Sequence, residues 1–216
     1  MNAIKDKEAL YSWFASLYLR APAAKLLQPF SDPEAISVLT SFFHDEPYQT
    51  ALKELTAHIK QARLEDLRNE FDALFVVPSK RNYVPPYESC FREKRGNEIG
   101  NLWGETTADV ARYYREAGYE AKNLQGIFAP DHIGVELAFI AKLCADEMQL
   151  IKNNNDSGQT KKIEELRKSF LREHLSKWIE DFSKTVNALP SALFYKNLST
   201  LTAHMVHSDL KFVKEL

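Results

Sequence analysis

Glycine is scarce in this chain, with 7 residues among 216. Neither GxGxxG nor GxxxxGK[ST] is present, which argues against the two best-known nucleotide-binding loops. The two cysteines, Cys90 and Cys144, do not form a CxxC pair, so neither a metal-thiolate site nor a disulfide framework is expected. Both fall on apolar helical stripes, which indicates buried thiols in a reducing compartment.

An excess of positive charge is also missing, because 28 Lys and Arg stand against 30 Asp and Glu. The sequence therefore offers no overall basic field for nucleic acid. No uninterrupted apolar run approaches the roughly 18 residues that a membrane span needs. The first residues lack the basic and apolar regions of a signal peptide. We expect a cytoplasmic, soluble protein with no nucleic-acid partner and no stable membrane insertion.

Apolar residues recur at steps of three and four along almost the whole chain, which is typical of amphipathic helices. We find no convincing strand alternation, so the predicted fold class is all-α, a compact single-domain bundle over residues 1–216 with long ordered central loops. The expected helices run from about 5 to 20, from about 23 to 28, from Asp32-Pro33 to Phe43, from Pro47 to Ile59, from Leu64 to Phe75, from Thr106 to Ala117, from Pro130 to about 152, from Ile163 to before Pro190, and from Leu193 to Val206.

Several residues are predicted to start or stop these helices. Asp32 is an N-cap followed by proline, and Gly118 is a natural C-terminal stop. Thr106 and Asp109 have the spacing of a capping box. At Pro130, a proline in the first turn precedes Asp131, which is expected to accept backbone N–H bonds there. The simplest alternative is that Asp131 is only a cap and His132 only a surface residue.

Three segments break the helical pattern. Prolines and glycines make the stretch from Val76 to Gly104 a long loop with one or two helical turns after Tyr87, and long ordered loops are often functional. A second irregular segment, between about 119 and 130, is a candidate hinge. The polar run 153–158 is expected to be a flexible loop.

A peptide groove is the first candidate site. Phe71, Leu74 and Phe75 leave a helix end and run into the proline-rich loop that carries Pro86-Tyr87-Glu88. A rigid loop of this kind loses little entropy on binding and suits a preformed groove. The alternative is that Leu74 and Phe75 are core residues and the prolines are ordinary turn residues.

Metal binding is the second candidate. His132 and Glu136 lie four residues apart and face the same side of a helix, but a metal site needs at least a third ligand. His174, His204 and His207 are the further histidines considered for a composite site. A metal-dependent hydrolase is thus an alternative function, although no HExxH motif is present. Nucleophilic catalysis by Cys90 with His132 is a weaker signal still.

An ordered set of short motifs spans most of the chain: Phe71 to Pro78, Pro86-Tyr87-Glu88-Ser89, Leu102-Trp103-Gly104-Glu105-Thr106-Thr107 with Val110, Tyr114 and Gly118, Pro130-Asp131-His132-Ile133 with Glu136-Leu137, and Phe170-Leu171-Arg172-Glu173-His174-Leu175 with Trp178. Taken together, these motifs resemble the TorD/DmsD/NarJ family of molybdoenzyme maturation chaperones. Two residues depart from the usual pattern: Ala129 stands where many relatives carry Pro, and Tyr87 where some carry Trp.

The resemblance implies a cytoplasmic chaperone without catalytic activity. It implies binding to the N-terminal twin-arginine signal peptide, or another N-terminal segment, of a molybdopterin oxidoreductase until its cofactor is inserted. No cofactor of its own is expected, although the resemblance allows weak guanine nucleotide binding, and a monomer or a domain-swapped dimer is expected. The implied peptide site comprises Phe71, Leu74, Phe75, Pro86, Tyr87, Asp131 and His132.

Simple chemistry adds Glu88 and Glu136 to that set. A twin-arginine peptide offers two guanidinium groups followed by an apolar stretch. Carboxylates bind guanidinium groups by strong, directional, bidentate bonds, so Glu88, Asp131 and Glu136 are the predicted arginine partners. A helical adaptor without a peptide pocket is the remaining alternative.

Overall fold

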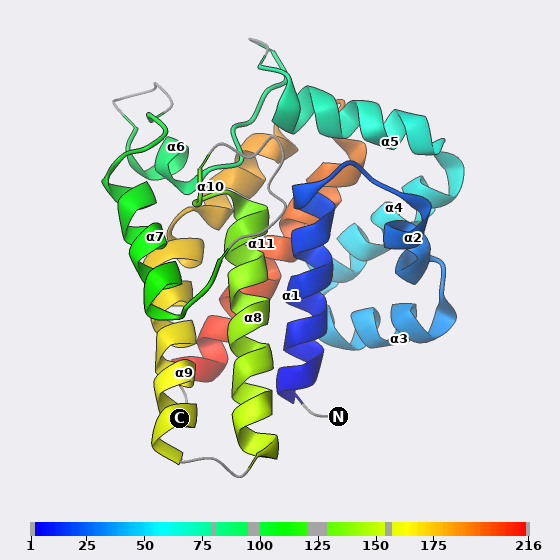
Figure 1. The fold of residues 1–216 in the computed structure, drawn as a ribbon. Helices are drawn as coiled ribbons and strands as arrows, with labels where there is room; N and C mark the ends of the chain where they lie inside the picture. The colour runs from blue at the N-terminus through cyan, green and yellow to red at the C-terminus, as the bar shows by residue number, and fades with distance from the viewer. Residues whose placement is uncertain (1–2, 79–80, 95–99, 121–128, 154–156, 215–216) are drawn as a thin grey trace. The chain divides into compact units, whose positions relative to one another are not determined.

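The computed structural model describes residues 3–78, 81–94, 100–120, 129–153 and 157–214 (Figure 1). Within these residues the chain is helical and has no β-strand, with one isolated β-bridge between Tyr87 and His132. The predicted all-α class is confirmed. No helix of the described part is long and apolar enough to cross a membrane.

Two compact units make up the structure, and each is described by itself. One comprises residues 1–19, 86–178 and 212–216, and the other comprises 20–85 and 179–211. We refer to them as the α8 unit and the α5 unit. The expectation of one domain over residues 1–216 stays a prediction.

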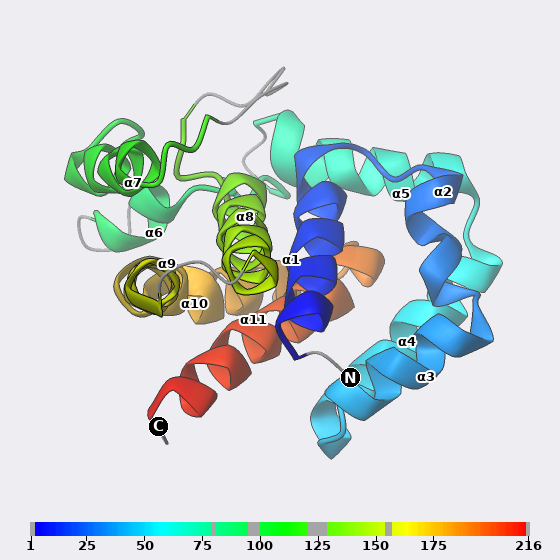
Figure 2. The ribbon, with the colours of Figure 1, turned by 60° about the horizontal axis from the view of Figure 1, so that its bottom comes forward.

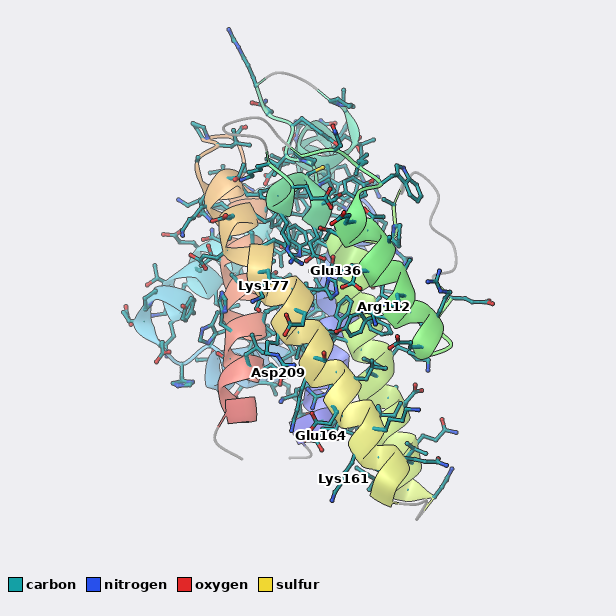
Figure 3. The ribbon with its side chains drawn as sticks, turned by 90° about the vertical axis from the view of Figure 1, so that its left-hand side faces the viewer. Arg112, Glu136, Lys161, Glu164, Lys177 and Asp209 are labelled. Carbon is teal, nitrogen blue, oxygen red and sulfur yellow. The ribbon has the colours of Figure 1, made fainter. Side chains whose placement is uncertain are left out.

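In the α8 unit, helix α8 lies between α1 and α9 in both views (Figures 1 and 2). This position explains why α8 is apolar on several faces, since Leu137 and Phe139 are both fully buried. Lys161 and Glu164 lie along α9 (Figure 3). The elements are α1 (Ala3–Leu19), α6 (Glu88–Arg92), α7 (Glu105–Glu116), α8 (Ile133–Lys152), α9 (Ser157–Phe170), a π-helical turn (Leu171–Leu175) and the beginning of α10 (Ser176–Asn187).

The α5 unit contains the remaining helical segments. Its core includes the aromatic rings of Phe43, Phe182 and Phe194, all buried. The elements are α2 (Ala24–Leu27), a 3₁₀ turn (Gln28–Phe30), α3 (Pro33–Phe42), α4 (Glu46–Gln61), α5 (Leu64–Phe71), a π-helical turn (Asp72–Val76), the remainder of α10 and most of α11 (Leu193–Lys214).

Two of the predicted helix starts and stops are confirmed, and one is wrong. Asp32 caps α3, with its Oδ1 accepting from the backbone N–H of Glu34 at 3.1 Å, and Gly118 has the positive φ of +60° that a left-handed stop requires. The capping box at Thr106 is wrong: Gly104 precedes α7, and the N–H of Thr106 donates to Glu93 at 2.8 Å. The neighbouring loop thus supplies the carboxylate that the box was expected to supply.

Two predictions about loops fall largely outside the described residues. The candidate hinge between about 119 and 130 contains residues 121–128, and the predicted flexible loop 153–158 contains residues 154–156. Of the second segment, Asn153 is the C-cap of α8, and Ser157 and Gly158 begin α9.

Candidate functional site

The nine residues predicted to bind a peptide divide between the two units. Phe71, Leu74 and Phe75 belong to the α5 unit. The other six come together in the α8 unit, where the loop before α6 meets the start of α8. All nine side chains are buried. The six are Pro86, Tyr87, Glu88, Asp131, His132 and Glu136.

A short antiparallel bridge ties these two chain segments together. The N–H of Glu88 donates to the carbonyl of Asp131, and the N–H of Ile133 donates to the carbonyl of Pro86, both at 2.9 Å. The Asp131 carboxylate also accepts from the N–H of Ser89 at 2.8 Å. Asp131 therefore caps α6, a helix 42 residues away in sequence, and does not cap its own helix as predicted.

His132 takes that capping role at α8. Its Nδ1 accepts from the N–H of Gly134 at 3.0 Å, so this ring nitrogen carries no proton. Burial lowers the pKa of His132 to about 3, which keeps the ring neutral. The ring meets Tyr87 edge-on, with centroids 5.2 Å apart. The alternative of a surface histidine is wrong, because the ring is buried and caps α8 in its neutral form.

The buried Glu88 is the centre of a chain of polar contacts that reaches the surface at Arg92 and Asp109. Its two carboxylate oxygens lie 2.6 Å from Arg92 Nη1 and 2.8 Å from His174 Nδ1. The other nitrogen of His174 lies 3.3 Å from Asp109 Oδ2. Arg92 also donates to the backbone carbonyl of Glu173 at 2.9 Å. Glu88 therefore joins α6 to the π-helical turn Leu171–Leu175.

Glu136 lies near Glu88 and Asp131 and has few hydrogen-bond partners. Trp178 Nε1 donates to one oxygen at 3.3 Å, and the other oxygen is buried without a hydrogen bond. Burial first, and then the negative charges of Glu88 and Asp131, raise the pKa of Glu136 well above its usual range. The side chain therefore favours its neutral form. In the view of Figure 3, Glu136 appears between α7, the helix of Arg112, and α9, the helix of Lys161.

This geometry changes the role that the three carboxyl groups can have. Glu88, Asp131 and Glu136 are completely buried, and Glu88 already has a cationic partner in Arg92. A guanidinium from another molecule does not reach them in this arrangement. Their contacts instead fix the loop before α6 against the start of α8.

The structure does not support the two catalytic alternatives, a Cys90 nucleophile and a metal-dependent hydrolase. Burial, and then Asp131, raise the pKa of Cys90 to about 11, which is the opposite of what a thiolate nucleophile requires. Within the described residues, no group of three or more His, Cys, Asp and Glu is arranged to hold a metal ion. His204, one of the further histidines considered, stacks on Tyr48 with ring centroids 3.7 Å apart.

Of the other three predicted residues, Phe71 and Phe75 belong to an aromatic cluster in the α5 unit, and Leu74 lies between them in the chain. Phe75 meets Tyr195 edge-on at 4.8 Å and stacks on Phe182 at 6.1 Å, and Phe71 lies 5.7 Å from Phe75. The carbonyl of Leu74 accepts from the N–H of Val84 at 2.8 Å, which holds the following loop against this turn.

An exposed apolar pair follows directly on this cluster. Val76 and Val77 are 53% and 56% exposed. In the sequence, the two valines stood out only as part of the motif from Phe71 to Pro78.

Arg92 and Trp178 contact this cluster and were not predicted as part of it, whereas His174 was considered only as a further ligand of a composite metal site. His174 is 86 residues from Glu88, so no local spacing could reveal the pair. Phe91 and Trp178 pack with centroids 5.5 Å apart, which holds the indole beside Glu136. In the sequence, only the family motif from Phe170 to Trp178 places His174 and Trp178 together.

Comparison with known proteins adds independent information. The family described as nitrate reductase delta subunit matches residues 44–184. Chaperone protein TorD of Shewanella pealeana is 20% identical, covering 96% of this chain and 90% of that protein. Chaperone protein TorD of Colwellia psychrerythraea is 24% identical, covering 97% and 93%. The selenate reductase assembly chaperone protein of Thauera selenatis is 32% identical, covering 59% and 61%.

Proposed function

This chain belongs to the nitrate reductase delta subunit family of TorD-like redox enzyme maturation proteins, and from that premise we propose that it binds the N-terminal twin-arginine signal peptide of a molybdopterin-containing oxidoreductase. It is a maturation chaperone, and its named relatives are chaperones and assembly proteins rather than enzymes. Bound in the cytoplasm, the client apoenzyme would be held until its cofactor is inserted, and its export would be delayed until then.

One observation carries the peptide-binding step: the exposed apolar pair Val76 and Val77 follows the buried cluster of Phe71, Leu74 and Phe75. A signal peptide contains an apolar stretch, which gains free energy when it covers exposed apolar side chains. The aromatic cluster fixes the backbone that presents the valines. The turn Asp72–Val76 is π-helical, and such turns occur frequently at functional sites.

In the α8 unit, the backbone bridge to Asp131 and Ile133 fixes the loop at Pro86-Tyr87, two residues predicted to contact the peptide. A loop fixed in this way loses little conformational entropy when it binds a ligand.

Isothermal titration calorimetry with synthetic peptides tests the proposal. The peptides are the twin-arginine signal sequences of the molybdoenzymes encoded in the same genome. We expect one peptide to bind, and the Val77→Ser protein to bind it roughly five- to tenfold more weakly, because a half-exposed valine loses part of a burial contribution of about 1.5–3 kcal/mol.

Val38 provides the matched control, because it is a valine of the same unit that is 41% exposed on α3. The Val38→Ser protein should bind as the wild type does. Equal weakening by both substitutions would show that the surface at Val77 is not the binding surface. If no signal peptide binds the wild-type protein, the peptide proposal itself is wrong.

A further inference from the structure

A cavity of about 300 Å³ lies in the α5 unit beside the aromatic cluster. This volume is at the small end of ligand pockets, which span about 300–1,000 Å³, and suits one side chain of a larger ligand. Glu70 on α5 and Leu74 in the following turn form part of the lining, and Leu193 at the start of α11 forms another part. Leu193 is 51% exposed, so an apolar wall is open to a partner.

Negative charge in this lining is not matched by positive charge. Asp66 and Glu70 line the cavity, and no Lys or Arg is among its described lining residues. Asp66 is already bound by Arg63, through Nη2 at 2.7 Å and Nε at 3.0 Å. Glu70 Oε1 accepts instead from the backbone N–H groups of Phe194 and Tyr195, at 2.9 and 2.8 Å, and Oε2 accepts from that of Phe194 at 3.2 Å. A carboxylate has about four lone-pair sites, so these contacts leave Oε2 able to accept from a further donor.

The titration of Glu70 reflects the same lack of a cation. Burial raises the pKa of Glu70 to about 7, against the opposing effect of the N–H groups of Tyr195, Phe194 and Leu193. The other titratable groups of the lining are His58 and Asp66. Burial lowers the pKa of His58, so the imidazole does not supply a positive charge near neutrality. A cation beside Glu70 would favour the ionised carboxylate.

We propose that this cavity receives an arginine guanidinium of the client's signal peptide, with Glu70 as its carboxylate partner. The inference rests on the proposed function and adds the arginine subsite, which the completely buried Glu88, Asp131 and Glu136 do not provide. The amide side chain of Asn69, which also lines the cavity, offers a further carbonyl acceptor.

Arginine fits this lining better than lysine. Its planar guanidinium presents five N–H donors in a fixed fork, whereas the lysine ammonium is a compact, strongly hydrated point charge. The aliphatic stem of arginine can lie on Leu74 and Leu193, as long cationic side chains do on apolar walls. The exposed Val76 and Val77 come two and three residues after Leu74 in the chain, so an apolar stretch that follows the arginines has a surface to occupy.

The test pairs the Glu70→Gln substitution with a change in the peptide. Glutamine keeps a carbonyl oxygen for the N–H groups of α11 and removes only the charge. Glu65→Gln is the matched control, since Glu65 is an exposed carboxylate of the same helix outside the cavity. Calorimetry at pH 8 uses the signal peptide that binds the wild type and the same peptide with glutamine in place of both arginines.

We expect Glu70→Gln to weaken binding of the arginine peptide by about ten- to a hundredfold, the range for losing a hydrogen bond to a charged group. Glu65→Gln should leave the affinity within about twofold, since exposed charges interact weakly with distant groups. The glutamine peptide should bind the wild type and Glu70→Gln equally. This pattern would assign the effect to a contact between Glu70 and an arginine.

The pH dependence of peptide affinity is a measurement that would not change if Glu70 had only a structural role. At pH 6 most of the wild-type protein has a protonated Glu70, and at pH 8 most has an ionised one, so the affinity should rise about tenfold over this range. Glu70→Gln should abolish this rise while His58 is unchanged. Thermal unfolding at pH 6, where the wild-type side chain is itself largely neutral, should give similar midpoints for both proteins and so establish that the variant is folded.

Two results would overturn the inference, and they are distinguishable. If the arginine peptide binds wild type and Glu70→Gln equally, the subsite is wrong while the peptide-binding proposal stands. If no signal peptide binds the wild type, both are wrong.

Discussion

Replacing Glu136 by glutamine should stabilise this protein progressively as the pH rises. The folded state holds Glu136 in a fully buried position where burial, Glu88 and Asp131 raise its pKa well above the usual range. The folded protein therefore keeps a proton that the unfolded chain releases above a pH of about 4.3. Unfolding releases that proton, so raising the pH favours unfolding.

Linkage gives the size of this effect. While the pH lies between the usual pKa and the raised pKa of Glu136, the wild type should lose about 1.4 kcal/mol of stability per pH unit relative to Glu136→Gln. This slope is a tenfold change in the folding equilibrium for each unit. Glutamine needs no proton, and its carbonyl can still accept from Trp178 Nε1, which is 3.3 Å from Glu136 in the wild type.

Urea denaturation followed by tryptophan fluorescence is the appropriate assay. All three tryptophans, Trp13, Trp103 and Trp178, lie in the α8 unit that contains Glu136. Wild type and Glu136→Gln would be compared at pH 5, 6, 7 and 8. Glu165→Gln is the control, because Glu165 is an exposed carboxylate on α9 in the same unit, and its difference from the wild type should not grow with pH.

The reasoning would be refuted by a stability difference between wild type and Glu136→Gln that stays constant from pH 5 to pH 8. It would be refuted equally by a variant that becomes less stable than the wild type as the pH rises. Either result would mean that the folded protein holds Glu136 ionised, and that Trp178 and its surroundings compensate the charge.

Three further outcomes follow from contacts of the same unit. Trp178→Phe should keep the packing on Phe91 but lose the donor to Glu136, and urea denaturation should show a loss of about 1–3 kcal/mol from the unsatisfied carboxyl oxygen. Gly134→Ala should lower the stability by about 1–3 kcal/mol, because an added Cβ would lie 2.7 Å from the side chain of Leu19; an unchanged urea midpoint would show that Leu19 moves away freely. The Cys90 thiol should react with a disulfide reagent only after urea unfolds the protein, because it is buried and its pKa is raised to about 11; rapid reaction in buffer would contradict this.

Helix positions were predictable because their signals are local. Asp32 followed by proline and Gly118 each act on backbone within a few residues, and both do what the pattern indicates. The apolar stripe of α8 was also readable, because a helix that packs on neighbours must repeat apolar residues at steps of three and four. The all-α class follows from such stripes alone.

Functional roles at the start of α8 were not predictable in the same way. Asp131 and His132 are adjacent, and capping preferences favour the aspartate. The structure assigns the cap to His132 because the Asp131 carboxylate is engaged by Ser89, a residue 42 positions away. Long-range hydrogen bonds of this kind leave no trace in local spacing.

The predicted arginine partners illustrate the same limit. Glu88 and Glu136 were chosen for their charge, yet burial and partners decide whether a charge can meet a ligand. His174 and Arg92 occupy Glu88, and burial favours a neutral Glu136. Glu70 was not singled out, since its importance arises from a cavity and from the α11 backbone 124 residues away.

Two π-helical turns connect these observations. Asp72–Val76 follows α5 and leads to the exposed valines, and Leu171–Leu175 follows α9 and carries His174 to Glu88. A π-helical turn closes i→i+5 hydrogen bonds and so contains one residue more than an α-helical turn. The extra residue rotates every side chain beyond it by about one residue's angle around the axis, which is roughly 100°. The apolar stripe nevertheless continues through the second turn, because His174, Trp178, Phe182 and Val186, at four-residue steps, are all buried. Periodicity does not reveal the partner of each residue, such as Glu88 for His174, 86 residues away. Helical periodicity therefore predicts the fold more readily than it predicts the site.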